Sequence, residues 1–70
     1  MSTERLANKM KALRAEAGLT QADLAAAVGV TRKTINTVEN NVFIPSALLA
    51  LKIARALGKR VEDVFYLAGD

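Results

Sequence analysis

The stretch Thr20–Asn41, TQADLAAAVGVTRKTINTVENN, decides the fold, because it holds two helices with their own start signals and a very short turn between them. Thr20 stands three residues before Asp23, and such a capping-box pair can satisfy free amides at the start of a helix. Gly29 can take the left-handed conformation that closes this helix, and Thr31 can cap the next one. The sequence therefore predicts two helices that cross steeply.

The rest of the chain predicts further helices on both sides of this stretch. Residues 4–17 place apolar side chains at spacings of four, three and four, which is one face of a helix. Ser46 can cap a helix that Gly58 ends, and residues 61–67 follow as a last short turn. We expect helices at 4–17, 20–28, 32–40 and 46–58 in a single domain over residues 1–70. The predicted fold class is all-α, a compact bundle of four to five helices with its helix-turn-helix at about 20–40.

Composition limits the chemistry that the chain can perform. A domain of 70 residues buries only about 60% of its unfolded surface, so association with a second copy would add stability. The chain has no Cys and no His, which removes the usual nucleophiles, bases and metal ligands, and its acids form no recognisable catalytic pair. We therefore expect no enzymatic activity, no metal and no cofactor.

Charge and hydrophobic patterning bear on the partner and the compartment. A formal net charge of +3 favours a polyanion as the partner, although many ordinary domains are this basic. Residues 1–5 lead into mixed charged and apolar residues, so neither a signal peptide nor a membrane span is visible. A chain without cysteine suits a reducing cytosol. We expect a cytoplasmic, nucleoid-associated protein with no membrane contact.

The second helix of the pair has a polar outer face. At about 100° of rotation per residue, Ile35 and Val38 mark its buried side. An arc of about 140° on the opposite side contains no acid and holds Arg32, Lys33, Asn36, Thr37 and Asn40. Arg and Lys can donate to guanine or phosphate, Asn can pair with adenine, and the Thr methyl can touch a thymine methyl. An ordinary solvated face is the alternative, but such faces more often carry residues of high helix propensity. The pattern therefore favours a helix that enters the major groove.

Two segments carry a family resemblance, Leu19–Ala25 (LTQADLA) and Val28–Asn36 (VGVTRKTIN). They resemble the Cro and lambda-repressor type of helix-turn-helix regulator, the XRE family, and the similarity covers nearly the whole chain. The resemblance implies that the DNA backbone is contacted by Gln21, Thr31 and Asn40. It implies that bases are read at Arg32, Lys33, Asn36 and Thr37. It also implies an ion pair between Arg14 and Glu39 that orients the reading helix. Asn41 departs mildly from the pattern, since Gly is common there and Asn also visits the left-handed region.

Leu48 departs more strongly, because relatives frequently have a polar residue at this position. By helical periodicity, Leu48 and Leu51 lie away from the core side of helix 46–58, so this helix is apolar on two sides. Scattered exposed leucines are normal, and Phe43 and Phe65 suit a core equally well. In the other interpretation, the apolar side chains outside the core contact another subunit, and residues 44–70 also serve dimerisation. The dimer surface predicted in this way consists of Ile44, Leu48, Leu51, Phe65, Tyr66 and Leu67.

These observations predict a sequence-specific transcriptional regulator of double-stranded DNA, a repressor that binds a two-fold symmetric operator as a homodimer. RNA polymerase and a toxin are further candidate partners. The alternative is a helical protein-interaction module, such as an antitoxin that acts mainly through a protein partner. The sequence leaves open whether the regulator is a repressor, an activator, a restriction-modification controller or an antitoxin.

Overall fold

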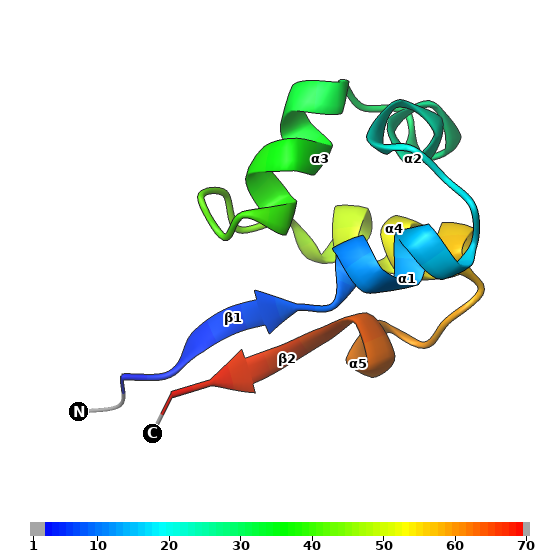
Figure 1. Ribbon diagram of the computed structural model, residues 1–70. Helices are drawn as coiled ribbons and strands as arrows, with labels where there is room; N and C mark the ends of the chain where they lie inside the picture. The colour runs from blue at the N-terminus through cyan, green and yellow to red at the C-terminus, as the bar shows by residue number, and fades with distance from the viewer. Residues whose placement is uncertain (1–2, 70) are drawn as a thin grey trace.

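The computed structural model describes residues 3–69 and shows five helices and a two-stranded antiparallel sheet among them (Figure 1). In chain order the elements are β1 (Arg5–Asn8), α1 (Met10–Glu16), α2 (Gln21–Val28), α3 (Arg32–Glu39), α4 (Ala47–Leu57), α5 (Val61–Val64) and β2 (Phe65–Ala68). The ends of the predicted 1–70 domain, residues 1, 2 and 70, lie outside the described residues. Within residues 3–69, no helix is long and apolar enough to cross a membrane.

The three central helices begin and end close to the predicted residues, because their signals are local. Thr20 Oγ1 accepts from the Asp23 amide at 3.0 Å, and Asp23 Oδ2 accepts from the Thr20 amide at 2.9 Å, so the capping box of α2 is complete. Gly29 closes α2 with φ of 75°. Thr31 caps α3 and Ser46 caps α4 through their side-chain oxygens. The helix-turn-helix is therefore confirmed at the predicted place.

The all-α prediction is wrong at the two ends of the described chain. Residues 5–8 form β1 rather than the first turns of a helix, and α1 begins only at Met10. At the end of β1, the Asn8 side chain meets the start of α1, because its Oδ1 accepts from the Met10 amide at 3.1 Å. The predicted turn at 61–67 divides into α5 and β2. The fold is predominantly helical with a small sheet.

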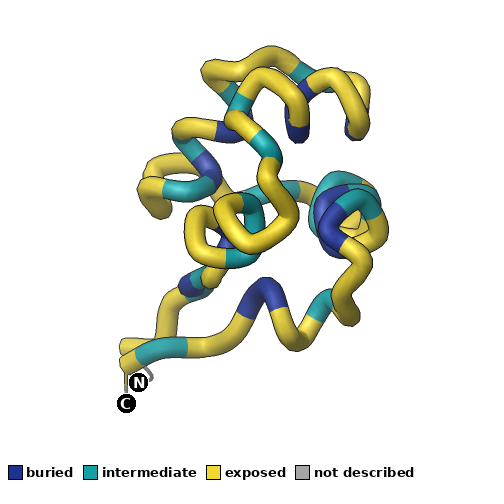
Figure 2. The backbone as a smooth tube through the Cα atoms, turned by 45° about the vertical axis from the view of Figure 1, so that its right-hand side comes forward, coloured by how far each residue is buried: buried dark blue, intermediate teal, exposed yellow. Residues whose placement is uncertain are grey.

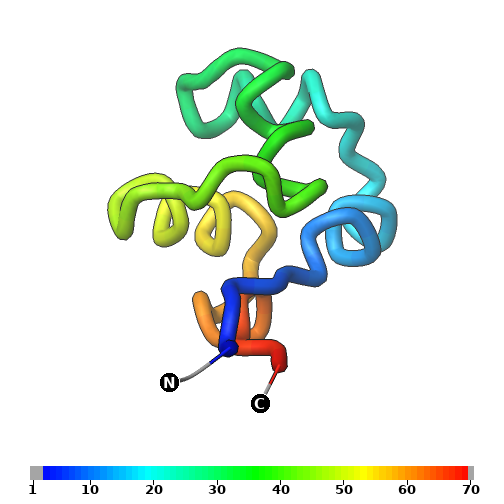
Figure 3. Tube along the Cα trace, turned by 90° about the vertical axis from the view of Figure 1, so that its left-hand side faces the viewer, coloured from blue at the N-terminus to red at the C-terminus, as the bar shows by residue number. Residues whose placement is uncertain are grey.

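Pairing between the ends of the chain explains this difference. Arg5 lies opposite Ala68, and the register continues through Leu6 with Leu67 and Ala7 with Tyr66 to Asn8 with Phe65. A strand gains its hydrogen bonds from a partner distant in sequence, which local helix periodicity does not report. Figure 3 shows the helix-turn-helix at one end of the molecule and the sheet at the other.

The core lies where the helices meet. Its fully buried members come from each of the five helices and are Met10, Leu24, Ile35, Val38, Ile53 and Val64. Figure 2 shows the buried positions on the inner sides of the helices, with exposed positions along the outside of the helix-turn-helix. Because Ile35 and Val38 are anchored in this core, the rotation of α3 about its axis is set.

Candidate nucleic-acid interface

The outward side of α3 is polar and carries cations but no exposed acid. Arg32, Lys33, Asn36 and Asn40 are exposed, whereas Ile35 and Val38 on the opposite side are 0% and 1% exposed. The structure thus places these four predicted DNA-contacting side chains on one accessible surface. We call the surface formed by Gln21, Arg32, Lys33, Asn36, Thr37 and Asn40 the reading face.

Threonines at the edges of the reading face are partly engaged within α3. Thr31 is exposed beside the first turn, and its hydroxyl oxygen accepts from the Thr34 amide at 3.2 Å. Thr37 is half-buried, and its hydroxyl donates to the Thr34 carbonyl at 2.9 Å. The Thr37 hydroxyl proton is therefore used inside the helix, which leaves its methyl group and an oxygen lone pair for an outside contact.

Glu39 lies on α3 but does not add negative charge to the reading face. Its Oε2 is 2.8 Å from Arg14 Nε, and its Oε1 is 3.4 Å from Arg14 Nη2. The side chains of Arg14 and Glu39 are only 15% and 6% exposed. Arg14 Nη1 also donates to the Leu19 carbonyl at 2.9 Å, just before α2. One guanidinium therefore ties α1 to the start of α2 and to the end of α3.

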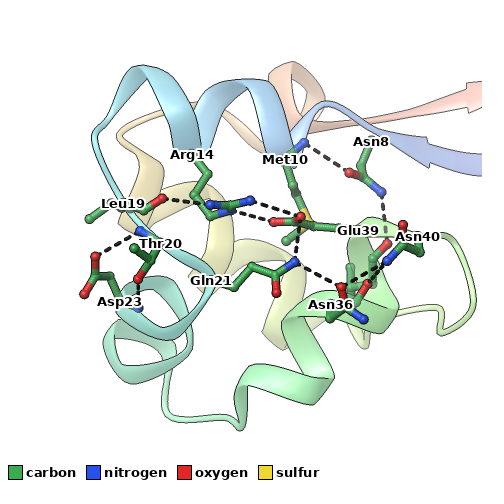
Figure 4. Close-up of polar contacts among 11 residues, drawn as sticks. Asn8, Met10, Arg14, Leu19, Thr20, Gln21, Asp23, Asn36, Glu39 and Asn40 are labelled. Carbon is green, nitrogen blue, oxygen red and sulfur yellow. Dashed lines mark hydrogen bonds and ion pairs between the residues drawn. The ribbon is translucent and has the colours of Figure 1, made fainter.

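A hydrogen-bonded network connects this ion pair to the reading face (Figure 4). The Gln21 amino group, Nε2, donates to Glu39 Oε1 and to Asn36 Oδ1, each at 3.1 Å. The Asn40 amino group donates to the Asn36 carbonyl at 2.9 Å and to Asn36 Oδ1 at 3.1 Å. Three predicted DNA-contacting residues thus bond to one another before any DNA arrives, which reduces the rotamer entropy lost on binding.

The start of α2 carries a stable negative charge. The backbone N–H of Thr20, which donates to Asp23 Oδ2, holds the pKa of this carboxyl below its ordinary value of 3.8, and the Thr20 side chain lowers it further. At neutral pH Asp23 is therefore ionised and the capping box is intact. Across residues 3–69, no cluster of three metal-ligating side chains gathers as a metal site would need.

Sequence reasoning missed Asn8, which holds the end of the reading helix. Its Nδ2 donates to the Val38 carbonyl at 3.0 Å and to Asn41 Oδ1 at 3.2 Å. Asn41 itself takes φ of 60°, the left-handed exit that the sequence allowed. A signal was available, because Asn is a weak helix former that favours caps and turns.

The apolar residues of the predicted dimer surface divide into two exposed groups and one buried residue. Ile44, Leu48 and Leu51 are 74%, 63% and 57% exposed, before and along α4. Tyr66 and Leu67 are 44% and 67% exposed, but they are neighbours in β2 and so point to opposite sides of the sheet.

Phe65 does not belong to an exposed surface. It is 8% exposed and packs in the core cluster, so the prediction that it joins the dimer surface is wrong. Its ring lies inward because β2 begins at the core end of the sheet, opposite Asn8. Phe43, the other aromatic that suited a core, is 49% exposed in the loop after α3.

Comparisons with known proteins agree with this geometry. The helix-turn-helix family matches residues 10–64. The HTH-type transcriptional regulator YgzD of Bacillus subtilis is 50% identical over 60 residues, which cover 86% of this chain and 91% of YgzD. An HTH-type transcriptional regulator of Methanothermobacter thermautotrophicus is 53% identical over 58 residues, covering 81% of this chain and 84% of that protein. Antitoxin HipB of Escherichia coli is 39% identical over 56 residues, covering 80% of this chain and 60% of HipB.

Solved structures show the same fold. The clp gene regulator ClgR from Corynebacterium glutamicum superposes with a TM-score of 0.74 at 30% identity, covering 77% of this chain and 57% of that chain. The transcriptional regulator VanUg superposes with a TM-score of 0.79 at 18% identity, covering 100% of this chain and 93% of that chain, which shows the fold alone. With the matched residues spanning α1 to α5, the chain belongs to the helix-turn-helix family of DNA-binding transcriptional regulators.

Proposed function

We propose that the protein is a sequence-specific transcriptional repressor that binds a two-fold symmetric operator in double-stranded DNA as a homodimer. The observation that carries this proposal is the reading face, which is exposed, rich in hydrogen-bond donors and free of exposed acids. Apart from Gln21 on α2, its residues lie on or directly after α3, the second helix of the helix-turn-helix, which such proteins place in the major groove. In this proposal residues 1–70 act as one domain, and residues 44–70 also supply the dimer contacts.

The side chains divide into two kinds of contact. Arg32, Lys33, Asn36 and Thr37 reach base edges, because they lie along the outer side of α3. Gln21, Thr31 and Asn40 contact phosphates at the rims of the groove, where contacts fix position rather than sequence. Arg14 and Glu39 touch no DNA in this arrangement and hold α3 at its angle to α2.

The dimer joins two copies through the exposed apolar side of α4. Two reading helices must enter successive major grooves about 34 Å apart, so each recognition surface points away from the contact between subunits. Leu48 and Leu51 are exposed on α4, away from the core side that holds Ile53 and Leu57. Ile44, Tyr66 and Leu67 extend the available apolar surface. A repressor of this kind gains affinity because each subunit reads one half-site.

Titration with duplex DNA tests the proposal. A duplex selected from a random pool should bind with Kd of roughly 10⁻⁸ to 10⁻¹¹ M at physiological salt, and a scrambled duplex of the same composition should bind far more weakly. Footprinting on the selected duplex should protect two symmetric half-sites. A preference below about tenfold would reject sequence-specific regulation.

A second candidate function is a protein-interaction role of the antitoxin kind. The similarity to antitoxin HipB favours it, together with the exposed leucines of α4, which could meet a different protein. DNA affinity that is weak, salt-sensitive and equal on every sequence would support this candidate over the repressor.

A further inference from the structure

The network on the reading face has a fixed direction of hydrogen bonding. Two groups at its ends accept hydrogen bonds: the Glu39 carboxylate, which is paired with Arg14, and the backbone carbonyl of Asn36. A side-chain amide can be turned either way, with its oxygen or its amino group toward a neighbour. A neighbour that only accepts removes that freedom, because it must meet the amino group.

Both amides that contact Asn36 are fixed in this way. Gln21 meets Glu39 Oε1 at 3.1 Å, so it presents Nε2 there, and the same nitrogen lies 3.1 Å from the Asn36 side chain. Asn40 meets the Asn36 carbonyl at 2.9 Å, so it also presents its amino group, which lies 3.1 Å from the Asn36 side chain. Asn36 is therefore approached by two donors from two independent anchors.

Asn36 has one orientation that satisfies these neighbours. With Oδ1 toward Gln21 and Asn40, its two acceptor sites receive two hydrogen bonds. The opposite orientation would set three amino groups against one another with no acceptor between them. The Asn36 oxygen is thus occupied inside the protein, and its amino group remains for an outside partner.

The free amino group lies where a base edge would arrive. Asn36 is exposed, and its Nδ2 finds no acceptor among residues 3–69. It borders an open hollow that is also lined by Gln21, Arg32 and Lys33. In Figure 4 the bonds to Gln21 and Asn40 converge on the oxygen of Asn36, which leaves the amino group on the other side.

We propose that Asn36 is a donor-only specificity residue, which donates to a base acceptor such as purine N7, guanine O6 or thymine O4 and accepts nothing from a base amino group. This proposal rests on the proposed DNA-binding function. It differs from the general expectation for asparagine, which pairs with adenine by donating to N7 and accepting from N6. The internal bonds of Asn36 Oδ1 exclude the second half of that contact.

Selection from a random pool with the wild-type protein and with Asn36→Ala identifies the base pair that Asn36 contacts. The preference should collapse at one pair per half-site and persist at the others. Asn36 is exposed on α3 and alanine favours helix, so the variant should fold, as its thermal midpoint checks. A uniform loss on all duplexes would overturn the proposal, because Asn36 would then contact phosphate.

Modified bases at that pair then test the direction of the bond. Acceptors are deleted with 7-deazapurine for N7, 2-aminopurine for guanine O6 and 5-methylpyrimidin-2-one for thymine O4. One of these deletions should weaken wild-type binding about tenfold and Asn36→Ala binding less than about twofold. Amino groups are deleted with purine for adenine and pyrimidin-2-one for cytosine. Neither amino deletion should weaken wild-type binding by more than about twofold, and a loss that Asn36→Ala abolishes would overturn the proposal.

The double variant Gln21→Ala, Asn40→Ala tests whether the network sets the direction. Without the two donors Asn36 can turn its oxygen outward and accept from a base amino group, so the amino deletions that the wild type tolerates should weaken binding of the double variant about fivefold. Overall affinity should also fall, but a ratio between duplexes cancels that loss. Unchanged preference in the double variant would overturn the proposal while the DNA-binding function stands. Absence of any sequence preference in the wild type would instead reject the function itself.

Discussion

Replacing Arg14 with alanine tests how strongly the scaffold of the reading helix depends on one guanidinium. An exposed ion pair contributes about 0.2–1 kcal/mol, whereas removing one partner of a buried pair destabilises by about 3–5 kcal/mol. Glu39 is 6% exposed and Arg14 is 15% exposed, so this pair lies close to the buried case but retains some solvent screening. We expect Arg14→Ala to lower the free energy of unfolding by about 2–3 kcal/mol. For a domain of this size the thermal midpoint should fall by roughly 8–24 °C.

A double-mutant cycle separates the pair from the other contacts of Arg14. Arg14→Ala leaves the Glu39 carboxylate with only the Gln21 amino group, and Glu39→Ala leaves the Arg14 guanidinium with the Leu19 carbonyl. The double variant buries neither charge, so its loss should be smaller than the sum of the single losses. We expect a coupling of about 1.5–2 kcal/mol from urea unfolding of the four proteins at one protein concentration.

Arg60 and Glu62 provide a matched control within the same chain. Their Nε–Oε1 distance is 3.2 Å, but their side chains are 77% and 63% exposed. The same alanine cycle on this pair should give a coupling of less than about 0.5 kcal/mol. Equal couplings for the two cycles would refute the reasoning, because burial would then contribute nothing to the Arg14–Glu39 interaction.

Further variants test the dimer, the capping box and the division of DNA contacts. Replacing both Leu48 and Leu51 with Glu should convert a dimer to a monomer in analytical ultracentrifugation at micromolar concentration, and a wild-type monomer or an unchanged variant dimer would reject the α4 surface. The folded pKa of Asp23 is lowered from 3.8, so its carboxylate stabilises the fold above pH 3.8 and this contribution is lost as the pH falls through the lower, folded pKa. Thermal melts of wild type and Asp23→Ala should therefore converge in acid, and a constant difference would contradict the capping role. Lys33→Ala should relax sequence choice and Gln21→Ala should weaken all duplexes alike, as binding to selected and scrambled duplexes will show.

The helices around the DNA-binding region could be predicted because their signals lie within a few residues. Thr20, Gly29 and Thr31 set the ends of α2 and the start of α3 through their own side chains and backbone, whatever the rest of the chain does. The polar side of α3 followed from Ile35 and Val38 in the same way. Local chemistry therefore sufficed for the position and rotation of the reading helix.

The remaining features depend on contacts between distant residues. Arg5 pairs with Ala68 near the other end of the chain, so the helix-like spacing of residues 4–17 predicted the wrong element at residues 5–8, although residues 10–16 do form a helix. Phe65 is buried because its strand starts against the core. Its place next to Tyr66 in the sequence does not indicate this burial. The direction of the amide of Asn36 depends on Glu39 being held by Arg14, and no property of the isolated helix determines that.

The first turn of α3 carries two cations at a position where acidic side chains would stabilise the helix more. Asp23 lies in the first turn of α2, whereas α3 begins with Arg32 and Lys33 and has no acid in its first turn. A cation at the positive end of a helix dipole is unfavourable by about 0.3–1 kcal/mol, and it is placed where phosphates would lie. Lys33→Glu should therefore raise the thermal midpoint by roughly 2–8 °C while lowering DNA affinity more than about tenfold.

Lys59→Glu makes the same change of charge with the opposite expected effect on stability. Lys59 is exposed and follows the carboxyl end of α4, where a cation is favourable, so its replacement should lower the midpoint slightly. It stands outside α3, so its effect on duplex binding should stay below that of Lys33→Glu at every salt concentration. Melting and duplex titration of the two variants measure both quantities. A fall in midpoint for Lys33→Glu would show that Lys33 does not destabilise α3. Equal losses of affinity for both variants would show that Lys33 has no special role in DNA binding.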